Sequence, residues 1–367
     1  MRLADLLRRH WPEYVRLRGG AHKIPAAHWR AVEAVLSCRT SRLGGHVHRC
    51  ACCEREHYVY HSCNHRACPS CGARTQQLWS ARQQARRLPV PYFMLTFTVP
   101  EQLRGFFLRY DRIAYSGLFA ASSGAIKELF ADPKHFGAEP GFVAVLHTWT
   151  RQVQYHPHVH VLVPAAALSQ NGCEAIRAKH ENYLLPYDAL ARSYRDQFLR
   201  HLRDKHPGLH AKLDPQLARM DWNVNIQSVG RGKVALRYLA AYVGKSAFSD
   251  ERLAGYDAQG RVRLWWTDSD TGKRQLMTLE PVELIRRWLL HVLPKGLTRV
   301  RHYGTLSAAA RDKYRRLRFL LGGRAHAVQL PEERPLRCPC CEGELHRVGK
   351  LRPVRGPPLS TALLYRR

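Results

Sequence analysis

Apolar residues follow a helical spacing at the start of the chain and an extended pattern in its middle. Residues 1–45 place apolar positions three or four apart, which predicts helices. Runs of β-branched and aromatic residues between prolines or polar turns are typical of buried strands. Such runs predict strands at residues 90–100, 142–149, 158–163 and 222–229.

The helical period returns between and after these strands. The predicted helices span residues 76–88, 102–130, 187–204, 233–243, 282–293 and 306–321. An extended segment at 261–279, with Asp270-Thr271-Gly272 near its centre, predicts a hairpin. Strands joined by short turns favour antiparallel pairing over parallel crossovers, so the pattern predicts an α+β fold.

The composition changes along the chain and divides it into three predicted parts. Residues 46–75 are rich in Cys and His and too irregular for a long element, and they fall in a first part at 1–89. Residues 90–330 carry the mixed strands and helices. Residues 331–367 contain six prolines and no periodicity, which predicts a loosely folded tail around its own cysteines.

The chain is strongly basic, with 59 Lys and Arg against 29 Asp and Glu, a formal charge of +30. This charge indicates nucleic acid as the partner, with an anionic membrane surface a distant second. A hydrophobic content of 45% excludes a disordered basic tail. No apolar run reaches the roughly 18 residues of a membrane span. Charges also interrupt the N-terminal segment where a signal peptide is apolar, so we expect a cytoplasmic protein.

Cysteines cluster at the spacing of zinc knuckles. Cys50 and Cys53 stand at C-x2-C, and Cys68 and Cys71 repeat this spacing. Each knuckle places two thiolates on one side of a tight turn, so the two pairs together predict one tetrahedral Zn²⁺ site. Cys52 is an alternative to Cys53 as a ligand.

Other cysteines leave the number of zinc sites open. Cys63 could complete a second site with a neighbouring histidine, and the candidates are His46, His48, His57, His61 and His65. Each histidine has a simpler interpretation as a solvated or DNA-contacting side chain. Cys38 lies outside the knuckles and is predicted to be a core residue.

A pair of histidines opens the apolar strand predicted at 158–163. Residues two apart share one face of a strand, so His158 and His160 point the same way and could hold one divalent ion. His147, across the predicted hairpin, is the expected third ligand, and His156 and Gln154 are weaker candidates. The simpler interpretation is a structural or surface pair, with His147 a core histidine bonded to backbone.

Tyr238 and Tyr242 lie four residues apart in a predicted helix, which puts both on one face. Aromatic pairs at this spacing usually pack in a core. A phenol with a pKa of about 10 is a weak nucleophile unless a metal ion polarises the phosphate it attacks. The histidine pair could supply that ion, and Lys233 and Lys245 would add positive charge beside the phosphate.

Arginines and lysines alternate with aromatic residues late in the chain. The basic segments are Arg286-Arg287-Trp288, residues 291–304 and residues 315–318. Cations for the backbone and rings for base stacking predict a channel for single-stranded DNA. Its predicted contacts are Lys295, Arg299 and Arg301. A solvated helix face is the alternative, chiefly for 315–318.

Several of these segments together resemble one known family, the two-tyrosine rolling-circle transposases of the HUH nuclease superfamily, in the IS-ninety-one-like group of insertion sequences. The similar segments are SCRTSRLGGHVHRCACC, HRACPSCG, LPVPYFMLTFTVP, HTWTRQVQYHPHVHVLVP, RYLAAYVGKSAFSDERL, LLHVLPKGLTRVRHYG and the tail pair in CPCC. The resemblance implies an HUH-type antiparallel sheet with flanking helices at 90–330. It also implies a small zinc-binding helical and ribbon domain at 1–89 that recognises DNA ends.

The resemblance also implies a mechanism and a setting. Mg²⁺ or Mn²⁺ on His158 and His160 would polarise a scissile phosphate of single-stranded DNA, and a tyrosine would attack it to form a 5′-phosphotyrosine. Tyr242 is expected to be indispensable, and the second tyrosine could receive the next strand. The expected partners are the ends of a bacterial mobile element and its target DNA, and the expected location is the nucleoid.

Three other functions fit part of the pattern. A plasmid replication initiator or a relaxase would use the same chemistry. A non-enzymatic zinc-ribbon regulator would explain the charge and the cysteines but leave the histidines and tyrosines without a role. A metallohydrolase acting through water would need no tyrosine. Formation of a covalent protein–DNA adduct separates the nuclease functions from the last two.

Overall fold

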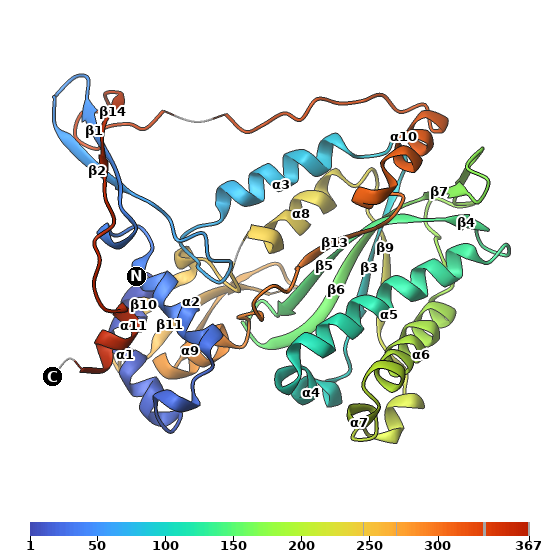
Figure 1. The fold of residues 1–367 in the computed structure, drawn as a ribbon, viewed down its shortest axis with the longest axis horizontal. Helices are drawn as coiled ribbons and strands as arrows, with labels where there is room; N and C mark the ends of the chain where they lie inside the picture. The colour runs from blue at the N-terminus through green and yellow to red at the C-terminus, as the bar shows by residue number, and fades with distance from the viewer. Residues whose placement is uncertain (245, 269, 333–334, 366–367) are drawn as a thin grey trace.

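A five-stranded antiparallel sheet forms the centre of the larger lobe (Figure 1). The computed structural model describes residues 1–244, 246–268, 270–332 and 335–365. The strand order is β13 (Val300–Gly304), β5 (Gly141–Trp149), β6 (Tyr155–Pro164), β3 (Tyr92–Thr98) and β9 (Val224–Ser228). Every neighbouring pair is antiparallel. The predicted α+β class is therefore confirmed.

Helices cover both faces of this sheet, because side chains alternate between the faces along each strand. Phe93, Phe97 and Val161 point to the face covered by α5 (Asp111–Ala131) and α6 (Tyr187–Lys205). The opposite face packs against other elements, namely α8 (Lys233–Gly244), α10 (Arg311–Leu320) and the segment around Leu88. Helix α3 (Ala73–Ala85) lies alongside α8 (Figure 1).

The strands predicted at 142–149 and 158–163 correspond to β5 and β6, whose residues are almost all buried, as expected for strands covered on both faces. The helix predicted at 102–130 is divided into α4 (Arg104–Arg109) and α5. Smaller elements complete the lobe: β4 (Ala138–Glu139), β7 (Ala166–Ser169), β8 (Ala175–Arg177) and α7 (Pro207–His210).

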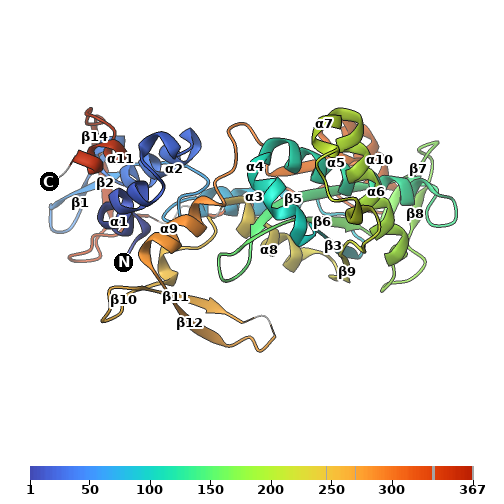
Figure 2. The ribbon, with the colours of Figure 1, turned by 90° about the horizontal axis from the view of Figure 1, so that it is seen from below.

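The second lobe is built from both ends and the middle of the chain. Its core joins α1 (Leu3–Leu17), α2 (Ala26–Ser37) and α9 (Pro281–Leu289) with residue Leu363 near the C-terminus. A three-stranded sheet packs beside them and projects from the lobe (Figure 2); its strands are β10 (Leu253–Tyr256), β11 (Val262–Thr267) and β12 (Arg274–Leu279). The boundaries predicted at 89 and 330 stay predictions, but packing in this core crosses both.

A third sheet joins the two ends of the chain. Its order is β14 (Leu345–Leu351), β1 (Gly45–Cys50) and β2 (Glu56–Tyr60), and a short helix α11 (Leu359–Ala362) follows β14. The prediction of a loose tail around its own cysteines is wrong. Strand β14 pairs antiparallel with β1 from Leu345 opposite Cys50 to Leu351 opposite Gly45. The edge of β1 supplies backbone partners that the proline-rich tail lacks on its own.

Within the described residues, no helix is both long and apolar enough to cross a membrane.

Candidate functional site

Three histidines converge on one face of the central sheet. His147 on β5 lies opposite His158 on β6, and His160 follows two residues later on the same face. The His147 Nδ1 atom lies 2.7 Å from His158 Nε2, and His158 Nε2 lies 3.2 Å from His160 Nε2. The three ligand atoms all lie within 4.8 Å of one another.

Neighbouring groups set the orientation of two of these rings. His158 Nδ1 lies 2.7 Å from the carbonyl oxygen of His156, so its N–H donates there and the Nε2 lone pair faces the cluster. Thr96 Oγ1 lies 3.0 Å from Nδ1 of His160. His156 itself lies outside the cluster, and Arg104 Nη2 lies 3.3 Å from its Nδ1.

Burial favours the neutral form of all three imidazoles. Burial lowers the pKa of His160 to about 4. Burial and the neighbouring histidines hold the pKa of both His147 and His158 well below the usual value.

Helix α8 places a tyrosine beside this cluster. The Tyr238 ring lies edge-on to His160 at 5.7 Å between centroids, and 45% of its side chain is exposed. Leu236 and Leu239 on the same helix are buried against the sheet, which fixes the face that α8 turns toward it. Tyr242 lies one turn later, but its side chain lies outside the described residues, as does Lys245.

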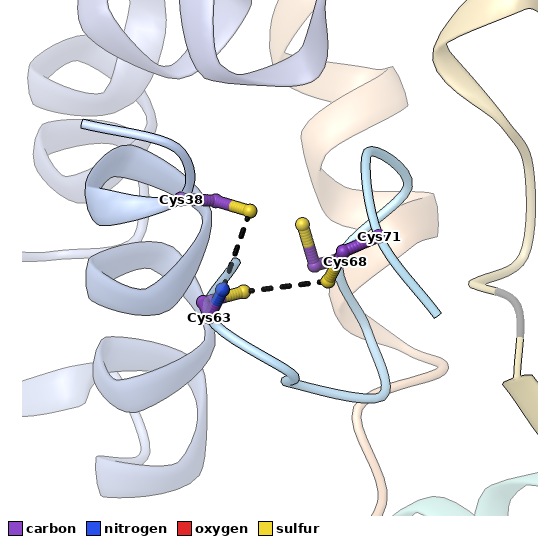
Figure 3. A group of neighbouring side chains, drawn as sticks. All are labelled: Cys38, Cys63, Cys68 and Cys71. Atoms are coloured by element: carbon purple, nitrogen blue, oxygen red, sulfur yellow. Dashed lines mark hydrogen bonds between the residues drawn. The ribbon is translucent and has the colours of Figure 1, made fainter. Parts of the chain in front are cut away.

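Four cysteines lie together between α2 and the loop that follows β2 (Figure 3). Cys38 ends α2, and Cys63, Cys68 and Cys71 come from the loop. The sulfurs of Cys63 and Cys71 are 3.7 Å apart, and the backbone N–H of Cys63 donates to the sulfur of Cys38. Cys38 is buried as predicted, but its sulfur belongs to a candidate metal site and not only to the core.

The structure does not bring together the four cysteines predicted to form one site. Cys68 and Cys71 lie with Cys38 and Cys63, whereas Cys50 and Cys53 lie with Cys338 and Cys341. The predicted single set is therefore wrong. Knuckle spacing specifies a turn that presents two thiolates, but it does not specify which other pair completes the tetrahedron.

The loop that carries Cys68 docks on the rest of the molecule. Trp288 Nε1 donates to the carbonyl oxygen of Ala67 at 2.8 Å. Arg66 donates to the carbonyl oxygens of Leu297 and Pro294 at 2.6 and 2.7 Å. The cysteine cluster thereby holds the segment that leads into β13 at the edge of the central sheet.

The predicted DNA contacts lie in different environments. Lys295 is exposed in the loop before β13. Arg299 is buried over the ring of Trp149, and burial lowers its pKa to about 10, so it is not available to a DNA backbone as predicted. Arg301 stacks over Phe119 of α5, on the sheet face opposite the histidines, and its predicted contact with DNA stays a prediction. Strand β13, which was not predicted, determines the orientation of Arg301.

Sequence reasoning missed a groove on the outer side of α8. The cavity has a volume of about 770 Å³ and lies between α3, α8 and the segment 326–331. Its basic residues are Arg87, Lys233 and Arg237, and glutamines of α3 line the opposite side. Lys233 and Arg237 are four apart in α8, so the helical spacing could have revealed this cationic edge.

Comparison with known proteins identifies the chain. Residues 141–313 match a family described as "Putative transposase", and residues 6–99 match a "Transposase zinc-binding domain". The chain is 34% identical to "Putative transposase y4qJ" of Sinorhizobium fredii (strain NBRC 101917 / NGR234), over 97% of each. It is 29% identical to the "Transposase for insertion sequence element IS801" of Pseudomonas savastanoi pv. phaseolicola, over 77% of this chain and 71% of that protein. No solved structure matches it.

These similarities define a transposase of insertion-sequence type that carries a zinc-binding domain. The chain belongs to the IS91 family of transposases. The family suggested by its sequence motifs is therefore confirmed.

Proposed function

We propose that this transposase nicks and rejoins single-stranded DNA at the ends of its element through a 5′-phosphotyrosine. The proposal rests chiefly on one observation, the position of Tyr238 beside the convergent His147, His158 and His160. A phenol next to a divalent-ion site is the arrangement that phosphoryl transfer to tyrosine requires.

The three histidines would hold the catalytic ion, with His147 as the third ligand. A divalent ion bound there would polarise a non-bridging oxygen of the scissile phosphate. Imidazole nitrogen suits Mn²⁺ better than Mg²⁺, which prefers oxygen ligands. We therefore expect Mn²⁺ to support the reaction at lower concentration than Mg²⁺.

The protein's own groups would direct the reaction. The carbonyl of His156 and the hydroxyl of Thr96 hold two imidazoles in place. The phenol oxygen of Tyr238 or Tyr242 forms the new bond to phosphorus while the bond from phosphorus to the 3′ oxygen breaks. The phenol proton is lost to solvent and the leaving oxygen gains a proton, so a free 3′ hydroxyl results. The reverse exchange rejoins DNA without another energy source.

The groove beside α8 is the proposed path of the strand. Arg87, Lys233 and Arg237 line it, and Arg237 directly precedes Tyr238. Arg237 and Tyr238 lie about 100° apart around the helix axis, so they project from adjacent sides of α8, and the proposed path leads from the groove around this helix to the tyrosine. Basic side chains along a groove hold the backbone of a single strand without reading its sequence.

The cluster of Cys38, Cys63, Cys68 and Cys71 is proposed to hold one structural Zn²⁺. Four sulfur ligands in a closed, partly buried site are typical of structural zinc and leave no open position for catalysis. The ion would keep the loop at Arg66 and Ala67 docked on α9 and on the segment before β13.

The test is denaturing electrophoresis of labelled single-stranded oligonucleotides from the element's own ends, incubated with the protein and Mn²⁺. The wild type should give a covalent adduct. His158→Ala and His160→Ala should abolish cleavage with DNA affinity largely kept, because affinity comes from many distributed cations.

The nucleophile is tested in the same assay. The double variant Tyr238→Phe, Tyr242→Phe should form no adduct, and Tyr183→Phe is a matched control, because Tyr183 is also about half exposed. A full yield of adduct from the double variant would reject these nucleophiles. DNA binding by the wild type without any adduct would favour a non-enzymatic regulator.

A further inference from the structure

Two short cysteine segments, far apart in the sequence, form the same turn. Cys50-Ala51-Cys52-Cys53-Glu54 and Cys338-Pro339-Cys340-Cys341-Glu342 share the pattern C-x-C-C-E. In each turn the final glutamate has a left-handed backbone, with φ of 56° at Glu54 and 60° at Glu342. Such φ values are uncommon for residues other than glycine, so the coincidence indicates a shared geometry.

The backbone hydrogen bonds of the two turns also correspond. The N–H of Glu54 donates to the carbonyl of Cys50, and the N–H of Glu342 donates to that of Cys338. The first cysteine of each turn donates its own N–H five residues onward, to Arg55 and to Gly343. The N–H of Cys52 and the N–H of Cys340 each donate to the sulfur two residues earlier, at 3.4 Å. Such N–H···S bonds stabilise thiolates.

The two turns face each other across the sheet that joins the chain ends. The sulfur of Cys50 lies 3.4 Å from that of Cys341, and the sulfur of Cys53 lies 3.7 Å from that of Cys338. All four sulfurs lie within 4.8 Å of one another. Two crossed pairs of thiols at this separation match a tetrahedron better than a disulfide, which joins only two sulfurs at about 2 Å.

We infer that Cys50, Cys53, Cys338 and Cys341 form a second structural Zn²⁺ site. This site would link the N-terminal β1–β2 hairpin to the turn that precedes β14 in the C-terminal segment. Two of these ligands lie beyond both matched regions, which end at residues 99 and 313. Thiolate ligands in tetrahedral geometry select Zn²⁺ among common divalent ions.

The surroundings of the site agree with a bound ion. A Cβ atom added to Gly343 would lie 2.9 Å from the sulfur of Cys50, so only glycine leaves room for that ligand. Cys52 and Cys340 are exposed at the outside of the turns. His57 Nε2 lies 3.2 Å from the sulfur of Cys338, and His57, Cys338 and Cys340 form an alternative set of three ligands.

The segment between α10 and this link borders the proposed DNA groove. After α10, the described segment up to residue 332 runs alongside α3 (Figure 1). On the way, His326, Gln329 and Pro331 line the groove. A metal link between β1 and the tail would anchor the chain a few residues beyond this groove-lining segment.

The first experiment measures zinc in the full-length protein. It uses the His158→Ala, His160→Ala background, so that the histidine cluster contributes no ion. The parent should contain two Zn²⁺ per chain by elemental mass spectrometry, and Cys338→Ser, Cys341→Ser should contain one. The matched control is Cys52→Ser, Cys340→Ser, which removes the outward cysteines of the same turns and should keep two.

Three outcomes would overturn the assignment. One is a second Zn²⁺ that survives Cys338→Ser, Cys341→Ser, and another is a Zn²⁺ lost from the control, which would assign Cys340 and His57 as ligands. The third is a disulfide, which would leave one Zn²⁺ in the parent and lower its mass by 2 Da per bridge in denaturing mass spectrometry under non-reducing conditions.

A second measurement does not depend on the folding of a cysteine variant. Replacement of zinc by Co²⁺ in the parent should give the visible spectrum of two four-sulfur sites. Gly343→Ala should weaken one of them by at least 10-fold in a chelator competition, and Gly349→Ala should weaken neither, because its nearest contact is an ordinary 3.5 Å. Equal behaviour of the two glycine variants would contradict the site. These readouts are independent of strand cleavage, so they stand even if the proposed transfer reaction fails.

Discussion

Gly72→Ala should separate α3 from α8 and displace the helix that carries the tyrosines. Gly72 precedes α3 with φ of 95°, and a Cβ added there would lie 1.8 Å from the carbonyl oxygen of Gly244 at the end of α8. The contact must open by about 1.2 Å before it reaches 3.0 Å, below which real Cβ atoms are essentially never found. The atom in the way is backbone, so no rotamer change can relieve the overlap.

The expected magnitude has two parts. A left-handed backbone costs an alanine about 1 kcal/mol, and forced separation of packed helices adds about 1–3 kcal/mol. The sum is a loss of about 2–4 kcal/mol. A displacement of about 1 Å at a reacting group can cost about 100-fold in rate, so adduct formation should fall by a similar factor.

Gly172→Ala is the matched control for this prediction. Gly172 has φ of 72°, but nothing lies within 4 Å of its added Cβ. It should lose only about 1 kcal/mol and keep full activity. The assay is urea unfolding followed by circular dichroism, together with the oligonucleotide adduct assay. Equal losses of stability in the two variants would refute the role assigned to the contact between Gly72 and Gly244.

Three further predictions concern the core, the groove and a surface ion pair. Leu239→Ala should cost about 2–5 kcal/mol in urea unfolding, because this fully buried side chain packs α8 on the sheet. The double variant Lys233→Ala, Arg237→Ala should bind single-stranded DNA with a weaker salt dependence: the slope of log affinity against log salt concentration, measured by fluorescence anisotropy, should fall by about 1.4. The control variant Arg203→Ala, Lys205→Ala, on the other side of the sheet, should keep the wild-type slope. Hydrogen bonds from Arg286 and then Arg287 lower the pKa of Glu283 from 4.5 to about 2, so its stabilisation is full above pH 4.5 and is lost as the pH falls through 2. Glu283→Gln should therefore lower the folding stability by about 1 kcal/mol at pH 7, allowing for solvent screening, and by less at pH 3. Melting temperatures of the variant and the wild type measure this loss. A loss of stability that grows on acidification would contradict the predicted sign.

Local pattern was sufficient for the elements that carry the histidines and tyrosines. The run from Tyr155 to Pro164 is apolar and β-branched enough to be a strand wherever it is placed, and two-residue alternation puts His158 and His160 on one face. The run from Lys233 to Gly244 has a helical period, so the spacing of Tyr238 and Tyr242 follows from sequence alone. The hairpin geometry also indicated His147, because adjacent antiparallel strands bring a specific residue opposite His158.

Other features depended on contacts that local pattern cannot encode. The segment at 300–304 reads as a basic loop, and it becomes a strand only because the edge of β5 offers backbone partners. That pairing turns Arg301 to the far face of the sheet. Arg299 is buried over the ring of Trp149, which is far from it in the sequence.

The sequence by itself determined that this protein contains zinc-knuckle turns, a histidine pair on a strand and a tyrosine pair on a helix. Each of these depends only on residues within about ten positions of one another, whose geometry local backbone sterics and hydrogen bonds dictate. Only the tertiary structure decided which knuckles share a site. Cys50 and Cys53 meet Cys338 and Cys341 because β14 pairs with β1, and Cys38 meets Cys63 because α2 packs against the loop after β2. Any two thiolate pairs can complete a tetrahedral site, so local sequence does not specify which pairs combine. Long-range packing decides this, because it brings particular pairs close together.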